Sequence, residues 1–359
     1  MRRPALVVLP AMLSGFLFAA PRTVSHPASR SAPAAAGITM ADLDRLGKMP
    51  GDLAALPAPG LPPGPAQLAK IRLGRQLFFD NRLSADHSMS CATCHDPNKG
   101  FADALPLGKG FGGKLLRRHS PTVLNAVYNV VQFWDGRAVG LEAQATGPIM
   151  SNAEMNMGTE QHVVETLQSD DSYVRQFKDL YGVSPNLKLV GDAIASFEST
   201  LVTPDSPFDR YVRGDKKALT MPQKRGLALF IGKAACTQCH SGSNFTDNRF
   251  HNVGVPQSGA AADLGRYEVT KNDADRRAFK TPTLRNVALT APYLHDGSAA
   301  TLRDVVDLYN RGGGTDSAKS DLLFELHLSE QEKSDLVAFL DALTGNMPSL
   351  MTPIQTANK

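Results

Sequence analysis

The pentapeptide Cys91-Ala92-Thr93-Cys94-His95 decides how this chain folds, and it returns later as Cys236-Thr237-Gln238-Cys239-His240. The sequence contains 4 cysteines, and all of them lie in these two Cys-x-x-Cys-His units. This spacing is typical of c-type haem attachment, because two thiols three positions apart reach both vinyl groups of one porphyrin while the adjacent imidazole binds the iron. We therefore expect two covalently bound haem c groups. No cysteine remains for a disulfide or a catalytic thiol.

Two other interpretations of the cysteines are weaker. A thioredoxin-like redox pair does not require a histidine after its second cysteine. A zinc ribbon usually brings its two cysteine pairs within about 20 residues of each other, whereas the two pairs of this chain lie far apart.

The N-terminus has the features of an export signal, which covalent haem attachment outside the bacterial cytoplasm requires. Arg2 and Arg3 form a positive start, residues 5–20 are apolar, and Ala34-Ala35-Ala36 resembles a cleavage site. We predict a cleaved signal peptide over residues 1–36 and a periplasmic protein.

A retained membrane anchor is the alternative for this segment. Pro10 interrupts the apolar stretch, which falls short of the roughly 20 residues that span a bilayer. No later segment of the sequence is long and apolar enough, so we expect no stable membrane span.

Composition narrows the remaining choices. Of 359 residues, roughly 320 remain after cleavage, which suits two domains that each bury one haem. A formal net charge of +3 gives no reason to propose nucleic acid as a partner. Residues 37–65 are rich in Pro, Ala and Gly and are expected to form a loosely structured arm, and residues 347–359 a tail.

The chain repeats more than its haem motif, with equal spacing inside each copy. The matched segments are 74–78 with 226–230, 101–103 with 245–247, 121–125 with 282–286, Asp135-Gly136 with Asp296-Gly297, and Leu141 with Leu302. Such self-similarity predicts two haem domains related by internal duplication, over residues 66–205 and 206–346. The boundary is expected near Thr203–Pro207, where two prolines interrupt a helical pattern.

Most segments around these motifs follow a helical period, and strand-like alternation is scarce. The last helix is the clearest: Ser329 and Glu332 form a capping box, and Gly345 is expected to end it. Three apolar stripes support the assignment: Leu68, Ile71, Leu73 and Leu77; Ala193, Ile194, Phe197 and Leu201; Leu336, Phe339, Leu340 and Leu343. The predicted fold is mainly α, with long loops around two haems.

The repeat also indicates what faces each iron opposite His95 and His240. Counting equally from the paired leucines brings Pro148 into register with Tyr309. Proline has no side-chain donor atom, whereas a tyrosine oxygen can bind ferric iron. The first haem is then open to peroxide and the second closed. Tyrosines more often pack in cores, so a core aromatic is the alternative for Tyr309.

Several longer motifs resemble the bacterial di-haem cytochrome c peroxidase and MauG family. They are residues 73–80 with 91–96, 133–137, 281–286 and 291–297, and the resemblance covers most of the chain after residue 66. It implies that the N-terminal haem is the peroxide site and that the C-terminal haem transfers electrons, in agreement with the assignment from the repeat.

The resemblance also implies roles for four residues. Trp134 matches a tryptophan between the two haems, a relay for electrons or holes. Gln144, Pro148 and Glu154 match the residues on the peroxide side of the first haem, with Glu154 as the acid-base group. The alternatives are a packed core indole for Trp134 and, without the motif, a solvated helix-end residue for Glu154.

Three further features concern the ligands of the haems. Met150, Met155 and Met157 are interpreted as pocket lining. Phe111 stands where many family peroxidases have a histidine that blocks the resting peroxide site, which implies an open site without reductive activation. Tyr309 aligns with the axial tyrosine of MauG, and an anionic oxygen lowers the potential of the second haem.

A calcium ion between the domains is a further implication of the resemblance. Thr290 and Pro292 match its backbone carbonyl ligands, but His119 replaces an asparagine ligand, and histidine is a poor calcium ligand.

Taken together, the sequence predicts an enzyme that reacts with hydrogen peroxide at the first haem. In one version a small cytochrome c or copper protein supplies the electrons; in the other, a residue on a partner protein is oxidised, as by MauG. A di-haem electron-transfer cytochrome without catalysis is the alternative from another class. Dimerisation, which several relatives show, stays open.

Overall fold

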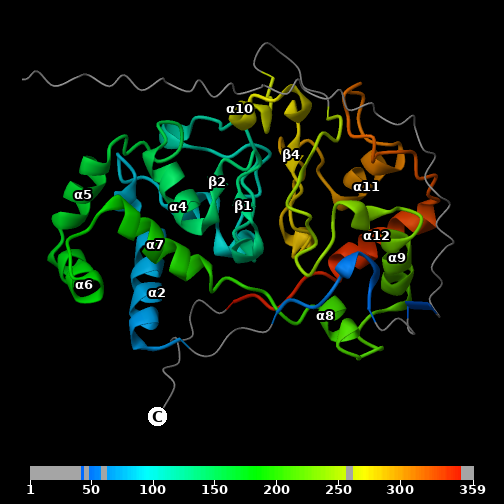
Figure 1. Ribbon diagram of the computed structural model, residues 1–359, viewed down its shortest axis with the longest axis horizontal. Coiled ribbons are helices and arrows are strands. Elements are labelled where there is room, and N and C mark those ends of the chain that lie inside the picture. Colours follow the sequence, from blue (N-terminus) through cyan, green and yellow to red (C-terminus); the bar gives the residue numbers. More distant parts are fainter. Residues whose placement is uncertain (1–41, 44–47, 58–62, 256–261, 349–359) are drawn as a thin grey trace, which may run out of the picture. The chain divides into compact units, whose positions relative to one another are not determined.

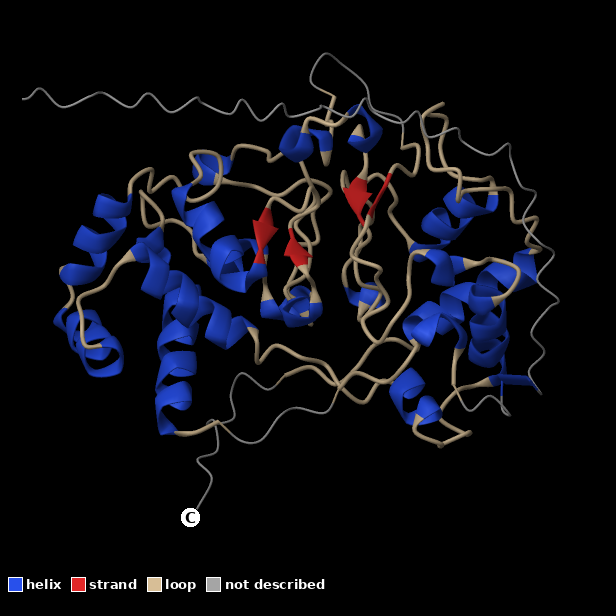
Figure 2. Ribbon diagram, viewed as in Figure 1, coloured by secondary structure: helices blue, strands red, loops and turns tan. Residues whose placement is uncertain are grey.

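The computed structural model describes residues 42–43, 48–57, 63–255 and 262–348, and this part of the chain is mainly helical (Figures 1 and 2). The helices are α2 (Pro65–Phe78), α3 (Cys91–Cys94), α4 (Gly140–Met150), α5 (Glu160–Gln168), α6 (Asp171–Tyr181), α7 (Leu187–Glu198), α8 (Pro207–Val212), α9 (Met221–Ile231), α10 (Tyr267–Thr270), α11 (Leu302–Asn310) and α12 (Glu330–Asp341). Within these described ranges, sheet is limited to two antiparallel pairs, β1 (Val131–Gln132) with β2 (Ala138–Val139) and β3 (Phe250–His251) with β4 (Phe279–Lys280). The expectation of a mainly α fold with long loops is confirmed.

The predicted signal peptide lies outside the described residues. Among those that are described, no helix is long and apolar enough to cross a membrane.

The first half of the chain is built around the contact of α2 with α7. A Cβ atom added to Gly74 of α2 would lie 1.8 Å from the backbone oxygen of Ala193 in α7, so only glycine permits this approach. The stripe predicted for α2 is buried, as expected. Leu201 is buried too, but it lies beyond the end of α7, where its carbonyl accepts a hydrogen bond from the backbone N–H of Asn125.

The second half contains the same kind of contact between α9 and α12. A Cβ atom on Gly226 would lie 2.0 Å from the backbone oxygen of Asp335. The predicted capping box of Ser329 and Glu332 is present. The predicted end of α12 at Gly345 is wrong: the helix ends at Asp341, and Gly345 is instead required because a Cβ there would lie 2.1 Å from the oxygen of Thr203.

Thr203 joins the two halves at the segment where the boundary is predicted. Its hydroxyl accepts hydrogen bonds from the side-chain amides of Asn125, at 2.8 Å, and Asn286, at 2.7 Å. Pro207 then starts α8, a position where proline is well tolerated because its missing N–H would have no partner.

Residues 48–57 do not form the loosely structured arm that their composition suggests. Leu53 is buried in the same apolar cluster as Phe208 of α8. The N–H of Leu56 donates to the Asp209 carboxylate at 3.1 Å, and the guanidinium of Arg285 donates to the carbonyl of Ala54 at 2.9 Å. A Pro- and Gly-rich segment can dock in this way because its own backbone groups find partners on the second half.

Candidate functional sites around the two Cys-x-x-Cys-His motifs

The first motif forms α3, and a capping box between Ser90 and Thr93 starts this short helix. The Nδ1 atom of His95, which follows α3, lies 3.3 Å from the carbonyl oxygen of Phe101. A carbonyl only accepts, so Nδ1 carries the proton and Nε2 keeps the lone pair that an iron atom needs. Burial lowers the pKa of His95, which favours the neutral imidazole required of a metal ligand.

The side chains predicted for the peroxide side come from α4 and the turn after it. Gln144 and Pro148 lie one helical turn apart on α4, so they share a face. The N–H of Met155 donates to the carbonyl of Pro148 at 3.0 Å and folds the turn that carries Glu154 back onto the helix. Burial, and then the nearby carboxylates of Asp103 and Glu154, raise the pKa of the Cys94 thiol to about 11. Glu154 is therefore close enough to the first motif to influence it electrostatically.

Residues 108–113 form a loop held against this turn. The N–H of Phe111 donates to the carbonyl of Glu154 at 2.8 Å, and Cys94 Sγ lies 3.8 Å from the carbonyl of Lys109. A Cβ on Gly110 would lie 1.9 Å from the oxygen of Ala153, so the approach requires glycine. Phe111 thus lies next to Glu154, the proposed acid-base residue. It occupies the position at which the resemblance implies a blocking histidine in many family peroxidases.

The second motif has the same local geometry. The Nδ1 atom of His240 donates to the carbonyl of Phe245 at 3.0 Å, which again leaves Nε2 free. Burial lowers the pKa of His240 to about 4. Both histidines are thus neutral and oriented through a backbone carbonyl, as metal-binding histidines usually are.

A cavity of about 280 Å³ lies over this second motif. Its wall includes Cys236, Cys239 and His240, and also Tyr309 from α11. Burial, followed by the nearness of Cys239 and Cys236, raises the pKa of Tyr309. Tyr309 also packs against the apolar cluster of the second half, and its role as an iron ligand stays a prediction.

The chemistry of these residues fits haem c. Each motif offers two thiols for thioether bonds and one imidazole for iron. Lys280 also lines the cavity; its Nζ donates to the carbonyl of Thr281 at 3.0 Å, and burial lowers its pKa to about 8. A haem carboxylate beside Lys280 would stabilise the charged form of the lysine. Sequence analysis did not single out Lys280, since one lysine in a loop has no distinctive pattern.

Trp134 lies at the junction of the two halves and lines the same cavity. Its indole N–H donates to the carbonyl of His119 at 2.9 Å, and its own carbonyl accepts from the N–H of Lys280 at 2.7 Å. Its ring contacts that of His295 at a centroid distance of 6.5 Å. Trp134 is therefore held by both halves through backbone hydrogen bonds.

Arg118 adds ion pairs at this junction. It contacts Asp135 of the first half at 2.6 Å and Asp263 of the second half at 2.6 Å. Its side chain is only 13% exposed, so these pairs are screened less than surface ion pairs.

Thr290 and Pro292, whose carbonyls are expected to bind calcium, line the cavity over the second motif. His119, which replaces the asparagine ligand, lines it too. His119 Nδ1 donates to the carbonyl of Leu105 at 2.8 Å. No calcium ligand geometry is apparent among the described residues, and calcium stays a prediction.

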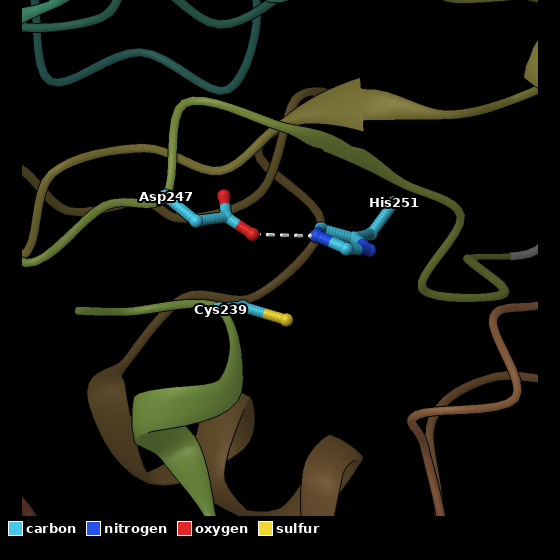
Figure 3. Close-up of side chains that lie close together, drawn as sticks. All are labelled: Cys239, Asp247 and His251. Carbon is cyan, nitrogen blue, oxygen red and sulfur yellow. Dashed lines mark hydrogen bonds and ion pairs between the residues drawn. The ribbon is translucent and has the colours of Figure 1, made fainter. Parts of the chain in front are cut away.

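A different group of metal-ligand type lies at Cys239, where Asp247 and His251 come together (Figure 3). The carboxylate of Asp247 accepts a hydrogen bond from His251 Nε2 at 2.9 Å. This bond raises the pKa of His251 to about 9. Because Cys239 belongs to the haem motif, we interpret the other two residues as an ion pair beside the haem attachment and not as a metal centre.

Comparison with known proteins agrees with this geometry. Residues 68–217 match the family model described as di-haem cytochrome c peroxidase. The chain is 42% identical to the methylamine utilization protein MauG of Methylorubrum extorquens, over 84% of this chain and 88% of that protein. It is 40% identical to the cytochrome c551 peroxidase of Pseudomonas aeruginosa, over 82% and 87%.

The fold is also similar to that of solved structures. A MauG-like protein associated with microbial copper homeostasis aligns with a TM-score of 0.72 and 29% identity, covering 86% of this chain and 97% of that one. The two Cys-x-x-Cys-His sites, the helical fold and these relatives together show that the chain belongs to the di-haem cytochrome c peroxidase and MauG family.

Proposed function

We propose that this protein is a periplasmic di-haem peroxidase that reduces hydrogen peroxide at its N-terminal haem. Electrons reach that site through the C-terminal haem. They come from a small redox protein, or from residues of a partner protein in a reaction like that of MauG.

The observation that carries the proposal is the difference between Pro148 and Tyr309. Both follow a leucine by seven residues, Leu141 in α4 and Leu302 in α11. Tyr309 lines the same cavity as the second motif, where its phenol would close the iron, whereas Pro148 would offer the first iron no ligand. An open iron and a closed iron suit a reaction site and an electron store.

The haem supplies the iron that binds peroxide and the redox chemistry of O–O cleavage. Glu154 supplies the proton transfer: its carboxylate takes a proton from the incoming peroxide and returns it to the departing oxygen, which leaves as water and not as hydroxide. Gln144, one turn before Pro148, orients the peroxide by hydrogen bonding. Full reduction to two waters consumes two electrons and two protons.

Trp134 is the proposed route between the halves. Its ring N–H is hydrogen-bonded to the carbonyl of His119 in the first half, and its backbone carbonyl to the N–H of Lys280 in the second half. An oxidisable indole held rigidly at this junction supports relay of electrons or holes. Tyr309 and Phe111 favour the MauG-like version, while the motifs as a whole suit both.

We also propose that the two halves are copies of one unit. Matching pairs of contacts support this: the N–H of His119 donates to the carbonyl of His295 at 2.8 Å, and the N–H of Lys280 to that of Trp134 at 2.7 Å. The same count of residues separates His119 from Trp134 and Lys280 from His295. His119 is thus equivalent to Lys280, and Trp134 to His295, so each contact is the counterpart of the other in the repeat.

One experiment separates this function from a di-haem cytochrome without catalysis. Peroxide is added to the purified ferric protein, followed by reduced cytochrome c. A peroxidase shows a high-spin haem that reacts within seconds, and cytochrome c then returns the spectrum to its resting form. If peroxide reacts but cytochrome c has no effect, the MauG-like version is supported. Low-spin spectra with no reaction would establish the electron-transfer alternative.

A further inference from the structure

Glu198, the last residue of α7, has a buried carboxyl group that no part of the proposed mechanism uses. Its side chain belongs to a residue only 3% exposed, and its Oε2 atom has no hydrogen-bond partner. Buried carboxyl groups of this kind are rare without a function, because an unpaired polar group in the interior is costly.

Contacts that recur within each half show which residue of the second half is equivalent to Glu198. Ala193 and Asp335 meet the glycines of α2 and α9 with their backbone oxygens. Leu201 and Leu343 accept hydrogen bonds from Asn125 and Asn286. Both pairs give the same register between α7 and α12. In this register, Glu198 of the first half is equivalent to Leu340 of the second half.

Leu340 lines the cavity over the second motif. By the same register, Glu198 holds the equivalent position at the first motif. An independent observation agrees: after burial, the charge of Glu198 is the largest cause that raises the pKa of the Cys91 thiol. The first haem site thus has a carboxyl group where the second has a hydrocarbon side chain.

Charged side chains near α7 come from α2, α4 and α5. From α4, the exposed Glu142 acts on it, and burial followed by this neighbour raises the pKa of Glu198 to about 8. From α2, Lys70 forms an ion pair with Asp192, which lies nearly two helical turns before Glu198 on α7. From α5, Glu160 accepts a hydrogen bond from the N–H of Leu187, at the opposite end of α7.

Glu142 is exposed to solvent next to a second pocket. It lines this pocket, a cavity of about 290 Å³, together with Ser196 and Ser199, two neighbours of Glu198 on α7. A polar cavity of this size has room for water.

We propose that Glu198 is a redox-linked proton-binding residue of the first haem. When the haem iron gives up one electron, from the ferrous to the ferric state, the Glu198 carboxylic acid releases one proton through Glu142 to the solvent. When an electron returns, the carboxylate takes one proton back. The added positive charge of the ferric state favours the carboxylate, and this is the physical link between the two events. The inference relies on the proposed first-haem site but not on peroxidase activity.

The test is an electrochemical titration of the purified di-haem protein between pH 5 and pH 10, without peroxide. We expect the midpoint potential of the first haem to fall as the pH rises, with a limiting slope of about 59 mV for each tenfold change in proton concentration. In Glu198→Gln, which keeps the size of the side chain, this part of the slope disappears. In Glu142→Gln, the sloping region moves to lower pH, because a negative neighbour has been removed.

Two controls keep the test specific. The potential of the second haem, which has Leu340 at the matching position, is expected to keep its pH dependence in Glu198→Gln. Redox-difference infrared spectra are expected to show a protonated carboxyl band in the ferrous wild type that is absent from Glu198→Gln and Glu198→Leu. An unchanged slope in Glu198→Gln would overturn the proposal, whether or not the protein reduces peroxide.

Discussion

At the scale of single residues, the buried Glu198 is expected to affect the pH dependence of stability as well as redox chemistry. Burial raises its pKa from 4.5 to about 8, so the folded state holds this proton more tightly than the unfolded state. The free energy of unfolding must then fall as the pH rises from about 4.5 to about 8, by up to about 5 kcal/mol for this group.

We expect Glu198→Gln to lose this part of the pH dependence. Guanidinium unfolding of both proteins at pH 5 and pH 8 measures it, and the variant is expected to gain stability relative to the wild type at pH 8. Glu165→Gln, on the exposed face of α5, is the matched control and is expected to follow the wild type. Parallel curves for the wild type and Glu198→Gln would mean that Glu198 is not buried as a neutral acid.

Glu154 provides the residue-scale prediction for catalysis. Glu154→Gln retains the size of the side chain but cannot accept a proton, so the reaction with peroxide should slow by roughly 10²-fold or more. Stopped-flow spectroscopy at several peroxide concentrations measures this rate. Glu160→Gln, at the start of α5, serves as the control with the same chemical change. A Glu154→Gln rate equal to that of the wild type would remove Glu154 from the mechanism.

At the scale of elements, the sequence predicted those features that depend on neighbouring residues. The haem motifs, the stripe of α2 and the capping box of α12 all follow from local spacing, and the structure contains them. The end of α12 was misplaced at Gly345, because that glycine serves an approach to Thr203 from a distant part of the chain. Glu198 was missed for a related reason: its burial depends on packing against α4, although comparing it with Leu340 in the repeat would have revealed it.

The glycines at the helix contacts are the clearest element-scale test. Gly74→Ala and Gly226→Ala each place a methyl group about 2 Å from a backbone oxygen of the facing helix. Overpacking of this kind costs about 1–3 kcal/mol or more, because backbone must move. Gly64→Ala is the control, since nothing lies within 4 Å of its added Cβ. Equal unfolding midpoints for Gly74→Ala and Gly64→Ala would show that α2 and α7 are farther apart than described.

At the scale of the whole molecule, residues 48–57 belong to the second half although they precede the first in sequence. Leu53 is 3% exposed within the cluster of Phe208. We expect Leu53→Ala to lower the free energy of unfolding by about 2–5 kcal/mol, as for other core leucines. Leu115→Ala is the control, because Leu115 is 67% exposed. A negligible effect of Leu53→Ala would support the loosely structured arm that composition suggested.

The junction at Trp134 determines whether the two halves work as one redox unit. Trp134→Phe removes one hydrogen bond to His119, so stability should fall by only about 1 kcal/mol. It also replaces an easily oxidised indole with a ring that is hard to oxidise. Electron transfer between the haems should therefore slow much more than the small loss of stability would explain. The measurement is the rate at which the reduced second haem is re-oxidised after peroxide is added. Phe133→Leu changes the adjacent aromatic residue, which packs over Arg137, and should leave this rate unchanged. If Trp134→Phe transfers electrons as fast as the wild type, the indole is a structural link between the halves, and charge crosses the junction by another route.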